Sequence, residues 1–481
     1  MEAVARSLPD EPVFLFRPHR LLKAAQWFSN NFPGDTFYAV KANPSPHVIR
    51  ELWRGGVRGF DVASLCEVQL VKSLFANAKL AFMHPIKNFN VISRAYFEYG
   101  VRRFVLDSHE ELKKIVLATK GATDLTLIVR FSVSNFGSTL PLSGKFGVHA
   151  DEAPSLLRAC RDVAQAMGIS FHVGSQSLAP IAYQCALEKV AASISSSIVL
   201  QESEGGRPIT IEVVDVGGGF PSVYDMDTPP PLEDYLDAIK CAIGSCSVFS
   251  KSKLWCEPGR ALAAEGEGLL TRIEGTKRGL EGDAGDMLYL NDGSFGALYD
   301  SVHEKWCYPV RAVRASGEIQ ASDSKDLVPY TLYGPTCDSA DKFPDAVMLP
   351  AGLKEGDYLE WGNIGAYGRC MATSFNGFGN YDTVKVEDSP WPSLYNAEAL
   401  VEPSGLTLSE ETLSAMSYFR KLSEETDVSP LDAVFIALRE EEAQSSASYN
   451  ESDIVSVDTD VTPSRDEENI FEEILQLGIM S

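Results

Sequence analysis

The chain has 481 residues, 44% of them hydrophobic and 10% aromatic, so it can fold into about two domains and is not disordered throughout. Its 67 acidic and 42 basic residues give a formal charge of −25, which argues against binding to nucleic acids or anionic membranes. Nine scattered cysteines without metal-type spacing, and an N-terminus without a long apolar run, predict a cytoplasmic protein with no disulfide scaffold, metal site, signal peptide or membrane span.

Short apolar runs alternate with amphipathic segments along the first half of the chain. The runs have the composition of strands, and the segments between them carry apolar residues at helical spacing and end in glycine. About eight such units predict an α/β fold, a parallel (β/α)8 TIM-like barrel, in which active-site residues lie at the carboxyl ends of the strands. The predicted strands span residues 37–41, 59–64, 80–84, 103–107, 125–131, 170–174, 211–217 and 253–259.

After about residue 270 the pattern changes to short β-type segments separated by Gly, Asp and Pro. Near the C-terminus the composition changes again, because residues 401–481 hold 19 acidic against 4 basic side chains, or −15 of the net charge. The expected parts are the barrel (13–265), a mostly β domain (266–387, joined by a strand from 1–20), a helical extension (388–442) and an acidic, disordered tail (443–481).

Lys41 ends the first predicted barrel strand, just before the turn-forming sequence Ala42-Asn43-Pro44. Most lysines at strand ends are solvated and merely flank an apolar segment. A lysine at the mouth of a pocket can instead lose its proton and bond to a carbonyl, including that of pyridoxal phosphate. Polar side chains at the ends of other predicted strands favour the second reading; they are Asp61, His84, Asp107, Arg130, His172 and Glu257.

The sequence VDVGGGFP places Gly217, Gly218 and Gly219 directly after a predicted strand. Because glycine has no Cβ, three in succession allow backbone N–H groups to approach a phosphate closely. A glycine triplet alone is more often a flexible loop. Here the strand before it favours a phosphate-binding loop.

Nine motifs follow one another over residues 13 to about 387: YAVKANP, FDVAS, KFG, HVGSQ, VDVGGGFP, EPGR, LYD, GPTCDSAD and GAY. In this order they resemble the fold-type III pyridoxal-phosphate decarboxylases, the alanine-racemase-like barrel family that includes ornithine, lysine, arginine and diaminopimelate decarboxylases. The resemblance implies pyridoxal 5'-phosphate as cofactor. It also implies a homodimer in which the GPTCD loop of one subunit reaches into the barrel of the other.

The resemblance assigns roles around the cofactor. Lys41 would carry the cofactor covalently, Glu257 would hold its pyridine nitrogen and His172 would lie against its ring. Asp61 and Arg130 match positions at its other edge. The phosphate contacts would come from the three glycines together with Ser175, Arg260 and Tyr367.

The resemblance also assigns a substrate pocket to Tyr299, Asp300 and Asp338, where the two carboxylates would receive a distal ammonium. Cys337 resembles the residue that reprotonates Cα after carbon dioxide leaves. Diaminopimelate enzymes have Glu-Ser-Gly where this chain has Asp338-Ser339-Ala340. We therefore expect decarboxylation of a basic L-amino acid, with ornithine to putrescine first and lysine, arginine or diaminopimelate as alternatives.

The chain departs from the family at His84, which stands where an asparagine usually precedes the proline. The segment SVSNFGSTLPLSGKFG is also longer than expected, and a loop of this kind can cover an active site. Two other readings stay open, a non-catalytic regulator suggested by the acidic tail and a racemase on the same barrel. The joint presence of Lys41, Glu257, Cys337 and Asp338 favours catalysis, and an acidic substrate pocket disfavours a racemase.

Overall fold

The computed structural model describes residues 2–142, 144–204, 207–279, 285–320, 327–387 and 391–395. All of them belong to the first of two compact units, Met1–Leu400. The second unit, Val401–Ser481, lies outside the described residues, and so do most of the predicted helical extension and the whole acidic tail.

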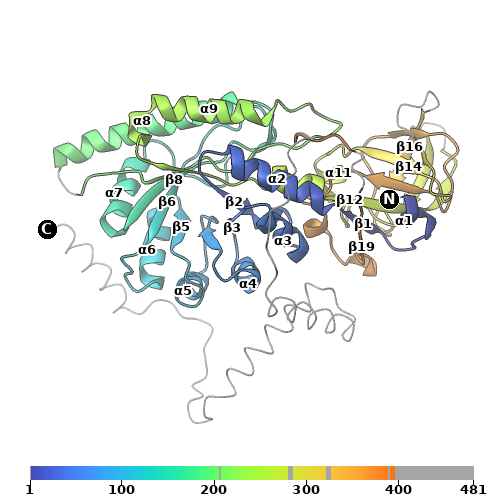
Figure 1. Ribbon diagram of the computed structural model, residues 1–481, viewed down its shortest axis with the longest axis horizontal. Coiled ribbons are helices and arrows are strands. Elements are labelled where there is room, and N and C mark those ends of the chain that lie inside the picture. The colour runs from blue at the N-terminus through green and yellow to red at the C-terminus, as the bar shows by residue number, and fades with distance from the viewer. Residues whose placement is uncertain are drawn as a thin grey trace, which may run out of the picture. The chain divides into compact units, whose positions relative to one another are not determined.

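Eight parallel strands close into a barrel, in the order β10-β11-β2-β3-β4-β5-β6-β8, which confirms the predicted barrel (Figure 1). Each neighbouring pair is parallel. The strands are β2 (Asp35–Ala39), β3 (Gly59–Val62), β4 (Lys79–Phe82), β5 (Arg103–Leu106), β6 (Thr126–Arg130), β8 (Ala166–Ser170), β10 (Val213–Asp215) and β11 (Lys253–Cys256).

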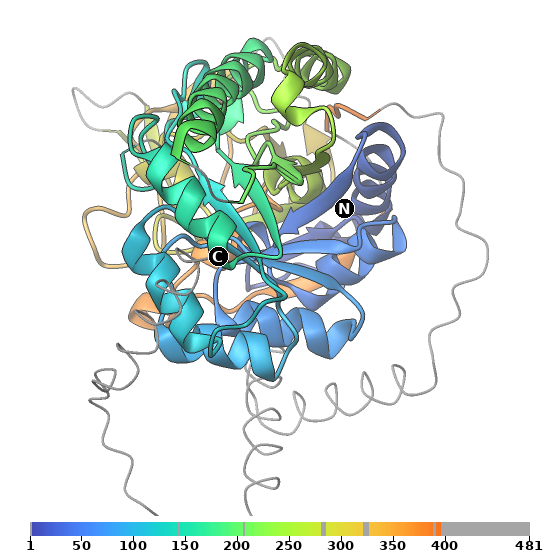
Figure 2. The ribbon, with the colours of Figure 1, turned by 90° about the vertical axis from the view of Figure 1, so that its left-hand side faces the viewer.

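Helices surround the barrel and alternate with its strands (Figure 2). They are α2 (Pro18–Asn31), α3 (Pro46–Arg54), α4 (Leu65–Leu74), α5 (Phe89–Phe97), α6 (His109–Ala118), α7 (Ala153–Val163), α8 (Ile181–Glu204) and α9 (Leu232–Ser245). Local chemistry fixes several starts: the Ser64 hydroxyl accepts the Glu67 N–H, and the Ser108 hydroxyl accepts the Glu111 N–H. Such N-caps satisfy amide groups that the helix itself cannot pair.

One strand lies four residues before its predicted place. The sequence predicts a strand over 170–174, but β8 ends at Ser170 and His172 lies in the loop beyond it. Gly168 explains why the strand itself is weakly marked in the sequence. A Cβ there would come within 2.9 Å of the Val213 side chain on neighbouring β10, so the close approach of the two strands requires a glycine.

The second domain is mostly β, as the sequence predicts, and nine strands of the described residues form one sheet in it. Strand β1 (Val13–Phe16) joins it from the N-terminus, antiparallel to β12 (Glu267–Lys277) and parallel to β19 (Asp382–Lys385). The remaining strands are β13 (Asp286–Leu290), β14 (Val310–Val313), β15 (Ile319–Gln320), β16 (Leu327–Tyr333), β17 (Val347–Pro350) and β18 (Tyr358–Trp361). Helix α11 (Tyr299–His303) follows β13.

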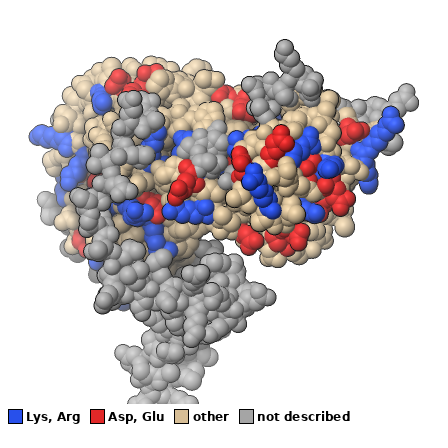
Figure 3. Space-filling model, turned by 45° about the vertical axis from the view of Figure 1, so that its right-hand side comes forward, with Lys and Arg blue, Asp and Glu red and all other residues tan. Residues whose placement is uncertain are grey.

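On the face drawn in Figure 3, the described basic and acidic side chains lie interspersed, without an extended basic area. Within the described ranges, no helix has the length and apolar character needed to cross a membrane. A search of the same residues finds no group of His, Cys, Asp and Glu that could hold a metal ion.

Candidate active site

Lys41 lies in a 3-10 turn (Val40–Ala42) that leaves β2 at the carboxyl end of the barrel. The turn is fixed from the β domain. Asn43 donates through its amide nitrogen to Glu267 Oε2 at 2.7 Å and to the Gly365 carbonyl at 2.8 Å, and the Tyr367 N–H donates to the Ala42 carbonyl at 2.8 Å. Backbone groups and a buried carboxylate of the β domain thus hold the lysine-bearing turn in place.

The ammonium of Lys41 faces a buried carboxylate on the neighbouring strand. Its Nζ is 3.8 Å from Asp61 Oδ2, and the Lys41 side chain is half-exposed whereas Asp61 is buried. Partial burial would lower the pKa of Lys41, but Asp61, Tyr367 and Glu257 outweigh it and hold the pKa above its ordinary value. Burial raises the pKa of Asp61, against the opposing effect of Lys41 and Arg130.

The three glycines after β10 form a loop that no other residue could form. Gly217 and Gly219 have φ angles of +71° and +109°, in the left-handed region. A Cβ at Gly217 would come within 2.0 Å of the Phe171 carbonyl oxygen, and one at Gly218 within 2.8 Å of the Glu257 carbonyl oxygen. The loop is therefore a bare backbone surface at the barrel mouth, the form of surface that anionic oxygens bind.

Glu257 follows β11 and is buried, and its Oε1 has no hydrogen-bonding partner among the described residues. Burial raises its pKa well above the ordinary value, and Asp215 and Asp61 raise it further. Burial also raises the pKa of Asp215 to about 7. A buried carboxyl oxygen without a partner is costly unless a ligand completes it, and a protonated ring nitrogen beside Glu257 would favour its ionised form.

His172 lies in the loop after β8, beside the glycine loop. Its Nδ1 accepts the Gly174 N–H at 3.1 Å, and a Cβ at Gly218 would come within 3.0 Å of Nε2. Burial lowers the pKa of His172 well below its ordinary value, and Arg130 and Lys41 lower it further. The ring is therefore neutral, with its proton on Nε2.

Arg260 begins the short helix α10 (Arg260–Ala263) and is buried. Its Nε and Nη2 donate to Ser175 Oγ at 3.4 and 3.3 Å, and its Nη1 donates to the Tyr224 hydroxyl at 3.2 Å. A single cavity brings most of the predicted cofactor residues together. It is lined by Lys41, Asp61, His172, Ser175, Gly218, Gly219, Glu257, Arg260 and Tyr367, with Ala39, Leu142, Phe220 and Gly259.

Two predicted cofactor residues lie next to this cavity without lining it. Gly217 N donates to Asp215 Oδ1 at 2.9 Å, which shapes the turn into the glycine loop. Arg130 ends β6, and its guanidinium carbon is 5.6 Å from the centre of the Phe146 ring. The charge of Arg130 opposes the upward pKa shift of Asp61 and adds to the downward pKa shift of His172, so it acts on the site electrostatically.

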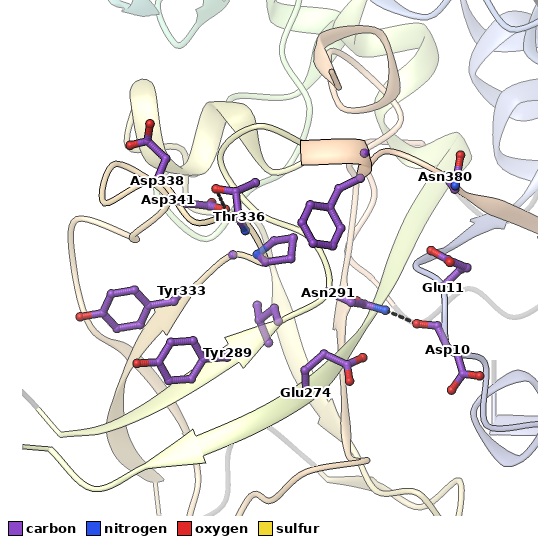
Figure 4. A pocket seen from close by; sticks show the side chains of 15 residues that line it. Asp10, Glu11, Glu274, Tyr289, Asn291, Tyr333, Thr336, Asp338, Asp341 and Asn380 are labelled. Carbon is purple, nitrogen blue, oxygen red and sulfur yellow. Dashed lines mark hydrogen bonds between the residues drawn. The ribbon is translucent and has the colours of Figure 1, made fainter. Parts of the chain in front are cut away.

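The predicted substrate residues separate into two groups. Tyr299 and Asp300 begin α11, and the buried Asp300 is close enough to Arg260 for that charge to oppose the upward shift of its pKa. Cys337 and Asp338 are exposed on a loop of the β domain. Asp338 lines a different cavity there, with Thr336, Asp341 and the stacked rings of Tyr289 and Tyr333 (Figure 4). Neither cavity is lined by all the predicted residues.

No motif in the sequence points to three side chains that contact the site. Tyr224 accepts from Arg260, as described above. Cys370 directs its Sγ at the Lys41 carbonyl oxygen, 3.3 Å away, and Trp306 lies 4.1 Å from the Arg260 guanidinium carbon. Tyr224 and Trp306 come from loops and Cys370 from a 3-10 turn (Arg369–Met371), none of them within a motif, so only the folded chain reveals them.

Comparison with known proteins agrees with this geometry. Residues 19–264 match the family model for the pyridoxal-dependent decarboxylase, pyridoxal binding domain. The chain is 31% identical over 394 residues to a lysine/ornithine decarboxylase from Selenomonas ruminantium, covering 81% of this chain and 93% of that protein. It is 31% identical over 389 residues to an ornithine decarboxylase from Caenorhabditis elegans, covering 77% and 86%. A solved structure of SrLDC in complex with PLP and cadaverine has a TM-score of 0.67 at 30% identity, covering 81% of this chain and 94% of that one.

The chain therefore belongs to the fold-type III pyridoxal-phosphate-dependent decarboxylases, and the resemblance seen in its motifs is confirmed. It is an enzyme of this class with pyridoxal 5'-phosphate as cofactor. The residues present fit that group: an ammonium for its aldehyde, a buried carboxyl with one unpaired oxygen for its ring nitrogen, and a glycine loop with an arginine for its phosphate.

Proposed function

We propose that this enzyme decarboxylates a basic L-amino acid, with L-ornithine as the preferred substrate and putrescine and carbon dioxide as products. The observation that carries the proposal is Asp300, a buried carboxylate beside the cofactor cavity that has no side-chain hydrogen-bonding partner among the described residues. Such a group is suited to receive the distal ammonium of a diamino acid. The names of the relatives support the same class of substrate.

The chain's own residues would divide the work at the cofactor. When bound, pyridoxal phosphate draws electrons from the Cα bond that breaks. Lys41 would carry it, Glu257 would keep its ring nitrogen protonated, and neutral His172 would lie against its ring. The glycine loop, Ser175, Arg260 and Tyr367 would hold the phosphate, and Asp61 and Arg130 would fix the edge near Lys41. Because all of these residues except Arg130 and Gly217 line one cavity, they would hold the scissile bond in one orientation.

We further propose that the site is completed by a second copy of the chain. Asp338 and Cys337 do not line the cavity of Lys41 in the chain that carries them. Their loop is exposed, and the Cys337 N–H donates to Asn376 Oδ1 beside the exposed side chains of Phe375 and Phe378. In a homodimer, Asp338 of one copy would join Asp300 and Tyr299 of the other at the distal ammonium. Cys337 would then return a proton to Cα.

Ornithine and lysine differ by one methylene, which changes binding by only about 1–3 kcal/mol. Lysine, arginine and diaminopimelate are therefore the competing substrates. A non-catalytic regulator has no physical need for Lys41, Glu257, Cys337 and Asp338 together. The nine unpaired cysteines support a reducing, cytoplasmic location.

The experiment is a comparison of four substrates. Purified protein with pyridoxal phosphate would be given ornithine, lysine, arginine or diaminopimelate, and carbon dioxide release would be followed. We expect the highest kcat/KM with ornithine. A higher kcat/KM with another of the four would transfer the proposal to that substrate, and release from none would contradict it.

A further inference from the structure

The guanidinium of Arg260 is enclosed by aromatic rings from both domains. Its Cζ lies 4.1 Å from the centre of the Trp306 ring, 5.0 Å from that of Tyr367 and 5.6 Å from that of Tyr224. Tyr224 follows β10 of the barrel, whereas Trp306 and Tyr367 belong to the β domain. The aromatic box, defined here as these three rings, therefore joins the two domains at the cofactor cavity.

The hydrogen bonds of Arg260 leave part of its binding capacity free. An arginine has five N–H donors in a fixed plane. Ser175 receives two of them and Tyr224 receives one. The other two have no partner among the described residues, although Arg260 lines the cavity together with Gly218 and Gly219. Both are available to a phosphate bound on the glycine loop.

Contacts of the Trp306 backbone and ring hold the indole against the guanidinium of Arg260. Its backbone N–H donates to the Asp300 carbonyl at 3.0 Å, and its ring meets Tyr224 edge-on, with centres 5.0 Å apart. The side chain is buried, and its Nε1 has no hydrogen-bonding partner among the described residues. The indole therefore interacts with Arg260 through the face of its ring, and its N–H group makes no hydrogen bond to a described residue.

We propose that Trp306 is a positioning residue for the cofactor phosphate. Its ring restrains the guanidinium of Arg260, so that the two free N–H groups point at the phosphate and not at water. The inference rests on the proposed role of Arg260 and extends it to the β domain, which supplies the restraint. A flat ring against a desolvated guanidinium attracts it strongly enough for about tenfold in affinity.

The test compares the dissociation constants of pyridoxal phosphate and of pyridoxal, which lacks the phosphate, measured by titration of the apoenzyme. Trp306→Leu should raise the constant for pyridoxal phosphate about tenfold and leave that for pyridoxal within about twofold. Trp306→Phe keeps an aromatic face without the N–H and should stay near wild type. Trp306→Met, which fills the space without a ring, should behave like Trp306→Leu and replaces it if the leucine variant does not fold.

The chain offers a matched control at Trp53 on α3, whose ring lies 4.3 Å from the Arg58 guanidinium carbon on the outside of the barrel. Trp53→Leu should change neither constant. Equal weakening of both ligands by Trp306→Leu, or a loss in Trp306→Phe as large as in Trp306→Leu, would overturn the proposal. Arg260→Met distinguishes the proposed restraint by Trp306 from the proposed phosphate contact of Arg260. If it removes the preference for the phosphorylated ligand while Trp306→Leu does not, the restraint is wrong and the phosphate contact stands; if it has no effect, the phosphate assignment itself is wrong.

Discussion

Asp300 is a buried carboxylate, and its side chain has no hydrogen-bonding partner among the described residues. Burial raises its pKa to about 6, with Arg260 opposing the shift and Glu304 adding to it. A carboxyl with this pKa is ionised at neutral pH and loses its charge in mild acid. Burial makes the ionised form of this carboxylate less favourable, and it also strengthens the attraction between the carboxylate and an incoming ammonium.

We therefore expect kcat/KM for ornithine to fall as the pH drops through about 6, because protonated Asp300 cannot pair with the distal ammonium. Asp300→Asn should lower kcat/KM by roughly a hundredfold or more at pH 8, since loss of one partner of a buried ion pair typically costs about 3–5 kcal/mol. It should also remove the acidic limb attributed to Asp300. A pH–rate profile of wild type and variant checks both effects, and an acidic limb unchanged in Asp300→Asn would contradict the assignment.

Among the barrel elements, the loop after β4 is fixed by a buried ion pair. Lys87 Nζ is 2.9 Å from Glu111 Oε1 on α6, and it also donates to the carbonyls of His84 and Val105. Burial lowers the pKa of Lys87 to about 8, although Glu111 opposes the shift. His84, the residue that departs from the family pattern, is thereby held with its ring 5.4 Å from that of Phe146.

Glu111→Gln should lower the free energy of unfolding by about 3–5 kcal/mol, because it leaves a buried ammonium without its counter-charge. Urea denaturation measures the loss. Glu98→Gln is the control, since Glu98 pairs with Arg94 at 3.0 Å on an exposed helix face, where less than about 1 kcal/mol is expected. Equal losses of unfolding free energy in the two variants would show that the buried Lys87–Glu111 pair stabilises the fold no more than the exposed pair does.

The sequence predicts the barrel well because its strands and helices obey local periodicity. The sequence places β8 four residues too late. The true strand contains Gly168, which is required by the close approach of β10 and not by any local pattern in the sequence. The residues at strand ends were predictable for the same reason, as the barrel gathers strand ends at one mouth. Trp306 and Cys370 were not, because their contacts join segments far apart in the chain.

For the whole molecule, the separation of Asp338 from the cavity of Lys41 has a direct consequence. If each site takes residues from two copies, a dimer of one Lys41→Ala chain and one Asp338→Ala chain contains one intact site. Random exchange of subunits makes half of the dimers mixed, so about a quarter of wild-type activity should return when the two inactive variants are combined. Activity that stays at the level of the separate variants would place the complete site within one chain.

Everything in the proposed chemistry depends on Lys41 as the residue that carries the cofactor. The direct measurement is borohydride reduction of the enzyme with pyridoxal phosphate, followed by digestion and mass spectrometry of the peptides. We expect the phosphopyridoxyl group on Lys41, 3.8 Å from Asp61 in the protein, and no label on that peptide in Lys41→Ala. A label confined to another lysine, or an enzyme that takes up no cofactor, would contradict the account.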